Sequence, residues 1–306
     1  MRARLLLNGK KASQEDIREA VYKLRAEGYE LEVRPTWEAG DFERLVLDAA
    51  QQKVTRIIAG GGDGTVNEIV DTFLRHNITS IELAVLPLGT ANDFASACEI
   101  PTNDAYQALS LAVTGHSYLV DAASVNERYF INIATAGFGA QVTANTPVAL
   151  KNFLGGGAYT LSGLVQALNF LPFQGTVKLD GKTRESNVVV GAICNGRMAG
   201  GGQLLAPEAY IDDGLLDAVS LESFMPSDMA TVIEELQQKN ISSGNFVYRE
   251  QVKQVEWISE SIMPVNLDGE PITSTQITIS VLPQAVALVL PDRCPVLKNA
   301  IRATIL

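Results

Sequence analysis

One stretch of sequence decides the fold, residues 54–68, VTRIIAGGGDGTVNE. The apolar run Val54–Ala59 predicts a buried strand, and a helix is expected to begin near Thr65. Glycines between a strand and a helix let the backbone approach a phosphate closely. The N–H groups and the dipole of the following helix favour an anion at the same place. The stretch therefore predicts a phosphate-binding loop at the end of a strand.

Two common nucleotide-binding motifs do not fit this loop. A Walker A motif requires a lysine followed by serine or threonine after its last glycine, and the loop has no lysine there. The dinucleotide fingerprint GxGxxG would require a glycine at Thr65 if it began at Gly60, or at Asn67 if it began at Gly62. A phosphate loop of a different kind is expected.

The sequence on both sides of this loop alternates between strand and helix patterns. Short apolar runs at Arg4–Asn8, Leu31–Arg34 and Glu82–Leu86 predict three more strands. Ser13 and Asp41 are the expected N-caps of two intervening helices. Strands that alternate with helices form right-handed crossovers and a mostly parallel sheet. We therefore expect an α/β nucleotide-binding domain over residues 1–122.

A second polar loop, Leu86–Phe94, follows the next predicted strand and has the sequence LPLGTANDF. Taken alone, it is equally typical of a turn capped by asparagine or aspartate. Adjacent parallel strands, however, bring such loops to the carboxyl edge of the sheet, where ligands of open α/β folds bind. Thr90 and Asn92 could then donate hydrogen bonds to a phosphate or a ribose.

From about residue 123 the pattern changes to short runs rich in valine, isoleucine and threonine, separated by turns. Such spacing predicts antiparallel strands. Asp180-Gly181, Asp213-Gly214 and Asp268-Gly269 are expected hairpin turns. The expected strands are Phe130–Ile133, Asn187–Ile193, Leu215–Leu221, Val252–Ile258, Met263–Leu267, Gln276–Val281 and Ala285–Leu290. Helical inserts are expected near Leu150–Leu171 and Ser227–Lys239, within a β-sandwich domain over residues 123–285.

Composition excludes several functional classes. The 306 residues include 24 Lys and Arg against 35 Asp and Glu, a net charge of −11. This balance argues against nucleic acid as a partner, because phosphate backbones require a basic footprint. Three cysteines outside any CxxC pair and two histidines predict neither a disulfide framework nor a Cys/His zinc site. The N-terminus lacks a signal peptide pattern and no run of 18 apolar residues occurs, so a cytoplasmic location is expected.

Tyr129–Val177 is unusually poor in charge, with Lys151 as its single charged residue in 49. One interpretation is a buried hairpin followed by a core helix. The other is an apolar cleft or surface that receives a lipid tail, because exposed apolar patches usually mark binding sites. The sequence leaves both open.

Three polar turns in the β half are candidates for chemistry. Asn195–Gly202 contains Gly200-Gly201-Gly202 and is expected to be a flexible loop. Ile211–Leu215 offers carboxylate and carbonyl oxygens, the ligands that hard cations prefer. Asn266–Glu270 places two acids on one hairpin. On pattern alone, the last two are also typical of solvated turns.

Taken together, these segments resemble the diacylglycerol kinase catalytic superfamily, and more narrowly the bacterial YegS-type lipid kinases. The resemblance extends over nearly the whole chain. GGDGT alone is shared with other kinases, whereas the LGTANDF loop and the late Asp-Gly-Glu of Asp268–Glu270 are specific. The resemblance implies an α/β domain followed by a β-sandwich, an active site in the cleft between them, and a C-terminal segment, about residues 286–306, that packs back on the first domain.

The resemblance also implies roles for individual residues. Glu270 matches the position of the proposed general base. Asp213, with the main-chain carbonyls of Tyr210 and Leu215, matches a structural cation site for Mg²⁺, with Ca²⁺ as the alternative. Asp268 is weakly implied as a second acid that faces a metal. The implied ATP site consists of Thr36, Gly61, Gly62, Asp63, Gly64, Thr65, Val66, Asn67, Glu68 and Thr90.

The leading hypothesis is an ATP-dependent lipid kinase that acts on a diacylglycerol-like or phosphatidylglycerol-like lipid from the cytoplasmic face of a membrane, as a peripheral protein. A kinase of the NAD kinase type, or another kinase of soluble small molecules, is the alternative enzyme. A nucleotide-binding sensor without turnover is the alternative from another class. The identity of the lipid and the oligomeric state are not predicted.

Overall fold

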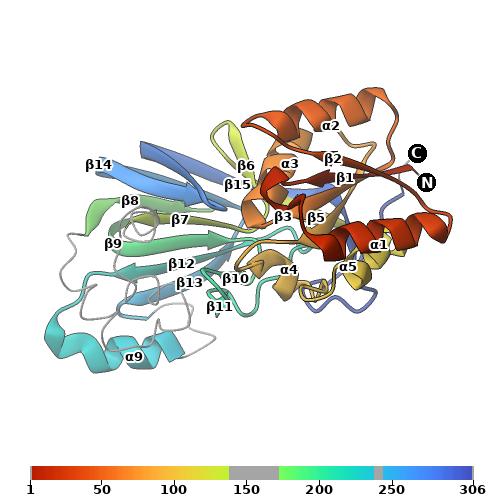
Figure 1. Ribbon diagram of the computed structural model, residues 1–306. Coiled ribbons are helices and arrows are strands. Elements are labelled where there is room, and N and C mark those ends of the chain that lie inside the picture. The colour runs from red at the N-terminus through yellow and green to blue at the C-terminus, as the bar shows by residue number, and fades with distance from the viewer. Residues whose placement is uncertain (1, 138–171, 238–243, 305–306) are drawn as a thin grey trace.

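The computed structural model describes residues 2–137, 172–237 and 244–304, which form two lobes (Figure 1). The expected insert near Leu150–Leu171 lies outside the described residues. The first lobe is α/β and the second is a β-sandwich, as the sequence predicted. Strand β15 belongs to both.

The α/β lobe is built on a parallel sheet in the order β4-β3-β1-β2. Helices α2 and α3 cover one face of this sheet, and α1 and α5 cover the other. Consecutive residues of β3 explain its unbroken apolar sequence, because Ile57 faces the α2/α3 layer and Ile58 faces the α1/α5 layer. The strands are β1 (Arg2–Leu7), β2 (Glu30–Pro35), β3 (Arg56–Gly61) and β4 (Glu82–Pro87). The helices are η1 (Gly9–Lys11), α1 (Glu15–Ala26), α2 (Asp41–Gln51), α3 (Asp63–Arg75), α4 (Asp93–Ala97) and α5 (Ala105–Thr114).

The predicted helix starts need correction. Helix α1 begins at Glu15 after Gln14, so Ser13 is not its cap. Asp41 is the first residue of α2, and its carboxylate instead accepts the N–H groups of Trp37 and Glu38 in the loop before the helix. Helix α3 begins at Asp63, two residues before the expected start. At α2, the loop that enters the helix has therefore taken the aspartate side chain expected to cap it.

The β lobe is antiparallel, and β7 and β8 share one position in it. Both lie between β9 and β14, β7 beside one half of each neighbour and β8 beside the other half. The chain between β7 and β8 is the undescribed segment 138–171. The strands of this lobe are β5 (His116–Val125), β6 (Arg128–Phe130), β7 (Ile133–Gly137), β8 (Phe173–Leu179), β9 (Lys182–Cys194), β10 (Met198–Ala199), β11 (Gln203–Leu204), β12 (Leu216–Glu222), β13 (Val247–Val252) and β14 (Gln254–Leu267). The insert expected near Ser227–Lys239 is η2 (Pro226–Asp228) followed by α9 (Met229–Gln237).

Two predicted hairpin turns are present and one is not. Asp180-Gly181 joins β8 to β9, and Asp268-Gly269 joins β14 to β15, with positive φ at both residues of each turn. This conformation matches the tight turns that twisted hairpins require. Asp213-Gly214 connects no paired strands and instead leads from a loop into β12, so its prediction as a hairpin turn was wrong.

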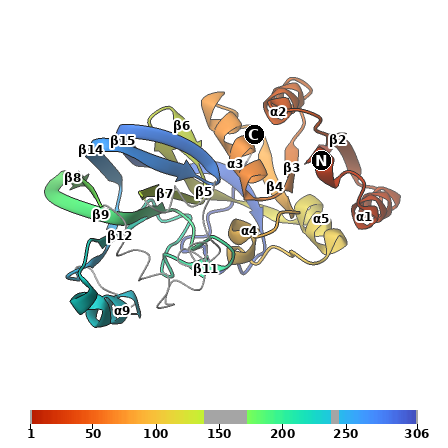
Figure 2. The ribbon, with the colours of Figure 1, turned by 60° about the vertical axis from the view of Figure 1, so that its left-hand side comes forward.

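Strand β15 (Glu270–Leu290) connects the two lobes (Figure 2). Its first half pairs with β14, and its second half pairs with β5 and, at Leu288, with β4 of the parallel sheet. The sequence predicted two separate strands here, because Pro283 interrupts the apolar pattern. The structure accommodates Pro283 at a register shift between Leu282 and Val286, where Gln284 has a φ of 54°.

Candidate functional site

The glycine loop lies at the carboxyl end of β3, beside the end of β4. Two of its glycines are required by packing. A Cβ on Gly60 would lie 2.9 Å from Leu5 Cδ1, and a Cβ on Gly61 would lie 2.2 Å from Thr65 Oγ1. Part of the glycine signal therefore comes from the close fit of β3 against β1 and α3 rather than from a ligand.

Gly62 brings the two predicted loops into contact. A Cβ on Gly89 would lie 2.6 Å from the Cα of Gly62, so only glycine fits at this crossing. Gly62 is also the N-cap of α3, and no side chain caps that helix. Because the N-terminus of a long helix presents N–H groups and a positive dipole end, this position suits a phosphate group. The expectation that both loops meet at the edge of the sheet is met.

The carboxylates of Asp63 and Asp93 connect the glycine loop to the β lobe through hydrogen bonds. The Asp63 carboxylate accepts the N–H groups of Asp93 and Phe94 at 3.3 and 3.1 Å, which caps α4. The Asp93 carboxylate accepts the N–H groups of Gly201 and Gly202 at 2.9 and 2.6 Å. Burial raises the pKa of Asp63 despite these donors. The Asp63 side chain is thus directed at α4, and the Gly200–Gly202 loop is tied to the α/β lobe.

The two predicted threonines lie on opposite sides of the glycine loop. Thr36 follows β2, two strands from β3, and its Oγ1 accepts the N–H of Gly9 at 3.1 Å. Thr90 follows β4 and is exposed. Both are at the carboxyl edge of the parallel sheet, so a ligand on the glycine loop could extend toward either.

The hairpin at Asp268-Gly269 is fixed by one carboxylate. Asp268 accepts three main-chain N–H groups, from Ile131, Asn132 and Ile133, at 3.0, 2.9 and 2.6 Å. These bonds also explain why Phe130–Ile133, predicted as one strand, is split between β6 and β7. Desolvation raises the pKa of Asp268 to about 6. With its oxygens occupied by N–H donors, Asp268 does not fit the weakly predicted role of a metal ligand.

Glu270 follows this fixed turn and is exposed. The ideal Cβ of Gly64 would lie 4.0 Å from the carbonyl oxygen of Asp268, so the hairpin approaches the first turn of α3. Burial and the charge of Glu270 both raise the pKa of Glu68 on that helix. Two unpartnered buried atoms, Oδ1 of Asn132 and Nδ2 of Asn266, belong to the same hairpin network. The structure thus brings the hairpin that carries Glu270 close to the glycine loop.

The loop before β12 contains the predicted cation site. The Asp213 side chain is 3% exposed; its Oδ1 accepts the N–H of Leu215 at 3.1 Å, and its Oδ2 lies 3.4 Å from the Lys298 ammonium. Among the described residues, no group of three or more His, Cys, Asp or Glu side chains could hold a metal. One carboxylate with the carbonyls of Tyr210 and Leu215 is nevertheless a set of hard oxygen donors, which fits Mg²⁺ or Ca²⁺ completed by water.

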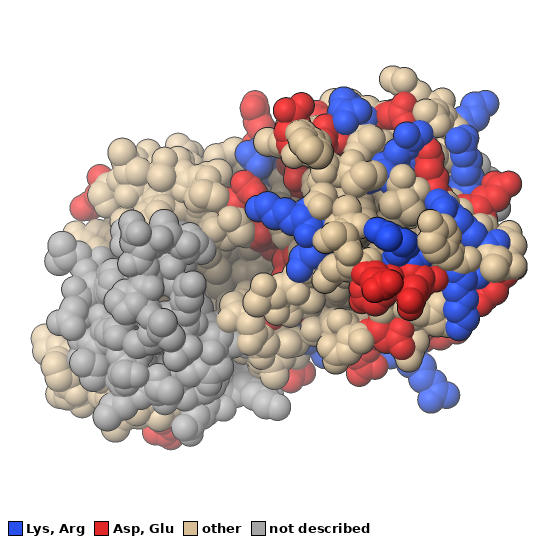
Figure 3. All heavy atoms as spheres, in the orientation of Figure 1, with Lys and Arg blue, Asp and Glu red and all other residues tan. Residues whose placement is uncertain are grey.

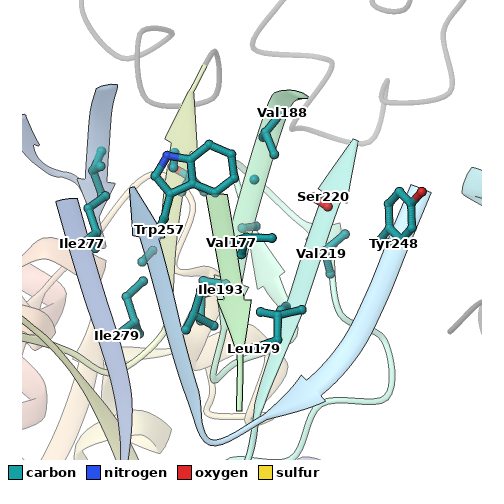
Figure 4. A pocket seen from close by; sticks show the side chains of 18 of the residues that line it. Val177, Leu179, Val188, Ile193, Val219, Ser220, Tyr248, Trp257, Ile277 and Ile279 are labelled. Atoms are coloured by element: carbon teal, nitrogen blue, oxygen red, sulfur yellow. The ribbon is translucent and has the colours of Figure 1, made fainter. Parts of the chain in front are cut away.

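A pocket of about 100 Å³ lies in the β lobe, away from the glycine loop (Figure 4). Its wall is mostly apolar and comes from several strands, with Ile277 and Ile279 at one side and Val219 and Tyr248 at the other. Ala134, Ala136 and Val177, at the two ends of the charge-poor stretch, also line it. The rest of that stretch, residues 138–171, lies outside the described residues.

Two family models cover the chain. The model described as "Diacylglycerol kinase catalytic domain" matches residues 2–125, and the "YegS C-terminal NAD kinase beta sandwich-like domain" matches residues 132–290. The chain belongs to the YegS-like lipid kinase family. It is therefore a kinase, and the family resemblance drawn from the sequence is confirmed.

Curated relatives of this kinase agree over nearly the full length. A protein of Shewanella frigidimarina named "Probable lipid kinase YegS-like" is 49% identical over 96% of this chain and 95% of its own. A relative of the same name from Chromohalobacter salexigens is 43% identical, with the same shares covered. A crystal structure from Bacillus anthracis superposes with a TM-score of 0.79 at 27% identity, over 96% of this chain and 98% of that one.

The surface of the kinase is hollowed between its two lobes. Figure 3 shows a hollow between the two lobes, with acidic and basic side chains at its rim and both charge signs spread over the α/β lobe. Within the described ranges, no helix is both long and apolar enough to cross a membrane.

Several residues with clear tasks were not singled out by sequence reasoning. Asp93 lay within the quoted second loop, but its bonds to Gly201 and Gly202 join residues 108 positions apart or more. Asp121 accepts the N–H groups of Gly214 and Gln284, which fixes the loop of Asp213 to β15. Lys298 carries no motif at all. Their contacts with residues distant in the sequence reveal them.

Proposed function

We propose that this kinase transfers the γ-phosphate of ATP to a hydroxyl group of a membrane lipid, with Glu270 as the general base. The lipid is diacylglycerol-like or phosphatidylglycerol-like. One observation carries the proposal: the exposed Glu270 carboxylate follows a turn that is held rigidly and that approaches the first turn of α3. This arrangement supports a reaction in which the glycine loop binds phosphate and Glu270 acts as the base.

The glycine loop would bind the phosphates of ATP. The open N-terminus of α3 and the backbone from Gly61 to Glu68 would neutralise phosphate charge without a lysine. Thr65 fits a supporting role, because it is buried against Gly61 and fixes the loop. Thr36 and Thr90 would contact the remainder of the nucleotide, one on each side. Phosphoryl transfer depends mainly on such positioning and neutralisation.

The chemical step requires few groups. The lipid hydroxyl oxygen attacks the γ-phosphorus, and a new P–O bond forms as the bond to the bridging oxygen of ADP breaks. The hydroxyl proton passes to the Glu270 carboxylate, and ADP leaves with the electron pair of the broken bond. General base catalysis of this kind contributes about 10²–10⁴ in rate. Asp268 acts as a positioning residue, since it holds the turn that carries Glu270.

A divalent cation is expected in two places. One would accompany ATP and neutralise its phosphate charge, as in other kinases. Another would be held by Asp213 and the main-chain carbonyls of Tyr210 and Leu215, with Mg²⁺ and Ca²⁺ as the candidate ions. At that second position the ion would stabilise the loop that Asp121 ties to β15.

The apolar pocket of the β lobe supports a lipid acceptor. Among the described residues that line it, Arg184 and Glu250 are charged and most of the others are apolar. Such a wall can take part of an acyl chain, which a soluble acceptor does not possess. The enzyme would then work at the surface of a membrane, from the cytoplasmic side. Part of the acyl chain of the acceptor lipid would leave the bilayer and enter the pocket.

The test is transfer of label from [γ-³²P]ATP to lipids presented in mixed micelles. We expect labelled lipid with the wild-type chain and a loss of about 10²–10⁴ in rate with Glu270→Gln. Glu260→Gln is the matched control, because Glu260 is an exposed acid on β14 outside the hairpin turn. ATP binding should survive in both variants.

Other outcomes would redirect the proposal. Transfer to soluble alcohols only would contradict the lipid acceptor. Full activity of Glu270→Gln would remove Glu270 as the base while leaving the kinase. Nucleotide binding with no transfer to any acceptor would favour a sensor.

A further inference from the structure

The C-terminal segment is attached directly to the loop of the predicted cation site. The Asp212 carboxylate accepts the main-chain N–H groups of Lys298, Asn299 and Ala300 at 2.6, 2.8 and 2.7 Å. The Asn299 side chain donates in return to the carbonyl of Asp212 at 2.7 Å. Residues 298–300 therefore have a fixed position beside residue 213.

This attachment places a positive charge at Asp213. The Lys298 Nζ lies 3.4 Å from Asp213 Oδ2 and 5.6 Å from the centre of the Tyr210 ring. Asp213 Oδ1 is already occupied by the N–H of Leu215. The ammonium group thus takes the oxygen of Asp213 that has no main-chain donor.

The two partners differ strongly in exposure. The Asp213 side chain is 3% exposed, whereas that of Lys298 is 52% exposed. A buried carboxylate requires a counter-charge, because an unpaired one is costly to desolvate. A half-exposed lysine is held weakly, because solvent screens the pair and the long side chain loses entropy when it is fixed. The carboxylate is therefore permanent at this site and the ammonium is exchangeable.

We propose that Lys298 is a built-in competitor for the cation position at Asp213. Without a divalent ion, its ammonium neutralises the carboxylate; when the ion binds, the ammonium leaves and its backbone stays anchored to Asp212. The inference rests on the proposed cation site and deepens it, because it names the residue that sets the affinity of the site. Asp213 then has a positively charged partner in both states, and the ion must displace the ammonium in order to bind.

The test is Mn²⁺ binding measured by electron paramagnetic resonance on the full chain without nucleotide. Removal of the competing charge in Lys298→Met should tighten the Asp213-dependent site about threefold to tenfold, since a divalent ion no longer faces a nearby ammonium. Lys298→Arg, which keeps the charge, should bind like the wild type. Arg293→Met is the matched control, because it removes an exposed positive charge from the same C-terminal segment.

Thermal unfolding gives an independent readout. In excess chelator, Lys298→Met should unfold about 1–3 °C below the wild type, because Asp213 has lost its counter-charge. Added Mn²⁺ should abolish that difference. Equal Mn²⁺ affinity and equal unfolding temperatures in the two proteins would overturn the inference.

Asp213→Asn separates this inference from the proposals on which it stands. If Asp213→Asn removes a Mn²⁺ site but Lys298→Met does not tighten it, the cation site remains and the competitor role is wrong. If no variant shows an Asp213-dependent site, both the cation site and the competitor role fail. Neither result bears on lipid phosphorylation, which the label-transfer assay measures separately.

Discussion

Asp213-Gly214 and Asp268-Gly269 are the same dipeptide in two loops of the β lobe, but their carboxylates have different partners. Asp268 accepts three main-chain N–H groups from a single stretch of chain. Asp213 accepts one N–H and is otherwise paired with a lysine side chain. A third turn, Asp180-Gly181, has a carboxylate that accepts the N–H groups of Lys253 and Gln254 at the surface.

The kind of hydrogen-bond donor decides whether each carboxylate can change its partner. Main-chain donors cannot leave without unfolding the loop that carries them, so Asp268 is committed to holding the hairpin of Glu270. A lysine side chain can leave, so Asp213 can change partner while the fold remains. The same residue type thus fixes a geometry in one place and offers a site in the other, and the variants below measure that contrast.

Asp268→Ala should have the largest effect. It leaves three N–H groups of residues 131–133 without acceptors, and each unsatisfied buried donor costs about 1–3 kcal/mol. We expect the free energy of unfolding to fall by about 3–4 kcal/mol and kinase activity to fall with it, because the turn before Glu270 is no longer fixed. Urea denaturation checks the first result; a loss below about 1 kcal/mol would contradict the role assigned to Asp268.

The pH dependence of stability should also report on Asp268. Its pKa is about 6 in the folded chain, above the ordinary 3.8, so folding favours its protonated form. Its stabilising contribution is therefore complete below about pH 4 and is lost as the pH rises through 6, by up to about 3 kcal/mol. Thermal unfolding from pH 4 to 7.5 should show this loss relative to Asp268→Asn; parallel curves would show that the pKa is not raised.

Asp213→Asn should have a smaller effect in chelator. The variant keeps an oxygen for the Leu215 N–H and loses only a partly exposed ion pair, which is worth about 0–1 kcal/mol. In saturating divalent cation the gap from the wild type should widen, because only the wild type binds the ion. A gap that does not change with the ion, measured by thermal unfolding, would make Asp213 as fixed as Asp268.

Asp180→Ala should have the smallest effect. The turn is exposed and its two N–H donors can bond to water instead, so we expect a loss of about 1 kcal/mol or less. Lipid kinase activity should be unchanged, because the turn lies at the opposite end of β14 from Glu270. Any loss of activity at constant stability would show that the distal end of the β lobe contributes to catalysis.

Local patterns predicted much of the α/β lobe and the positions of both polar loops. The signals for a strand, a turn and a helix lie next to one another from Val54 to Glu68, so the three could be inferred together. The hairpin of Glu270 was also predicted, because Asp268-Gly269 is a local turn signal. The packing reasons for Gly60 and Gly61 could not be predicted, because side chains of β1 and α3 leave no room for a Cβ at these positions.

Contacts between distant segments could not be predicted in the same way. Nothing near Ser13 reveals that the helix starts after it, and nothing near Asp213 reveals a lysine 85 residues later. The role first suggested for Asp268, facing a metal, failed because its three donors come from residues more than 130 positions earlier. The assigned roles of Glu270, Asp213 and the nucleotide-site residues remain predictions.

Strand β15 has a consequence for the order in which the chain can fold. Val286, Leu288 and Leu290, on its second half, belong to the core of the α/β lobe, and Leu288 pairs with Leu83 of β4. During synthesis the ribosome must therefore release almost the entire chain before the first lobe receives its last strand. Pairings of such long sequence separation form slowly, because loop closure comes before the contacts that compensate for it. The lobe that is made first is completed last, and a nascent chain that stops short of β15 leaves it with an open sheet edge.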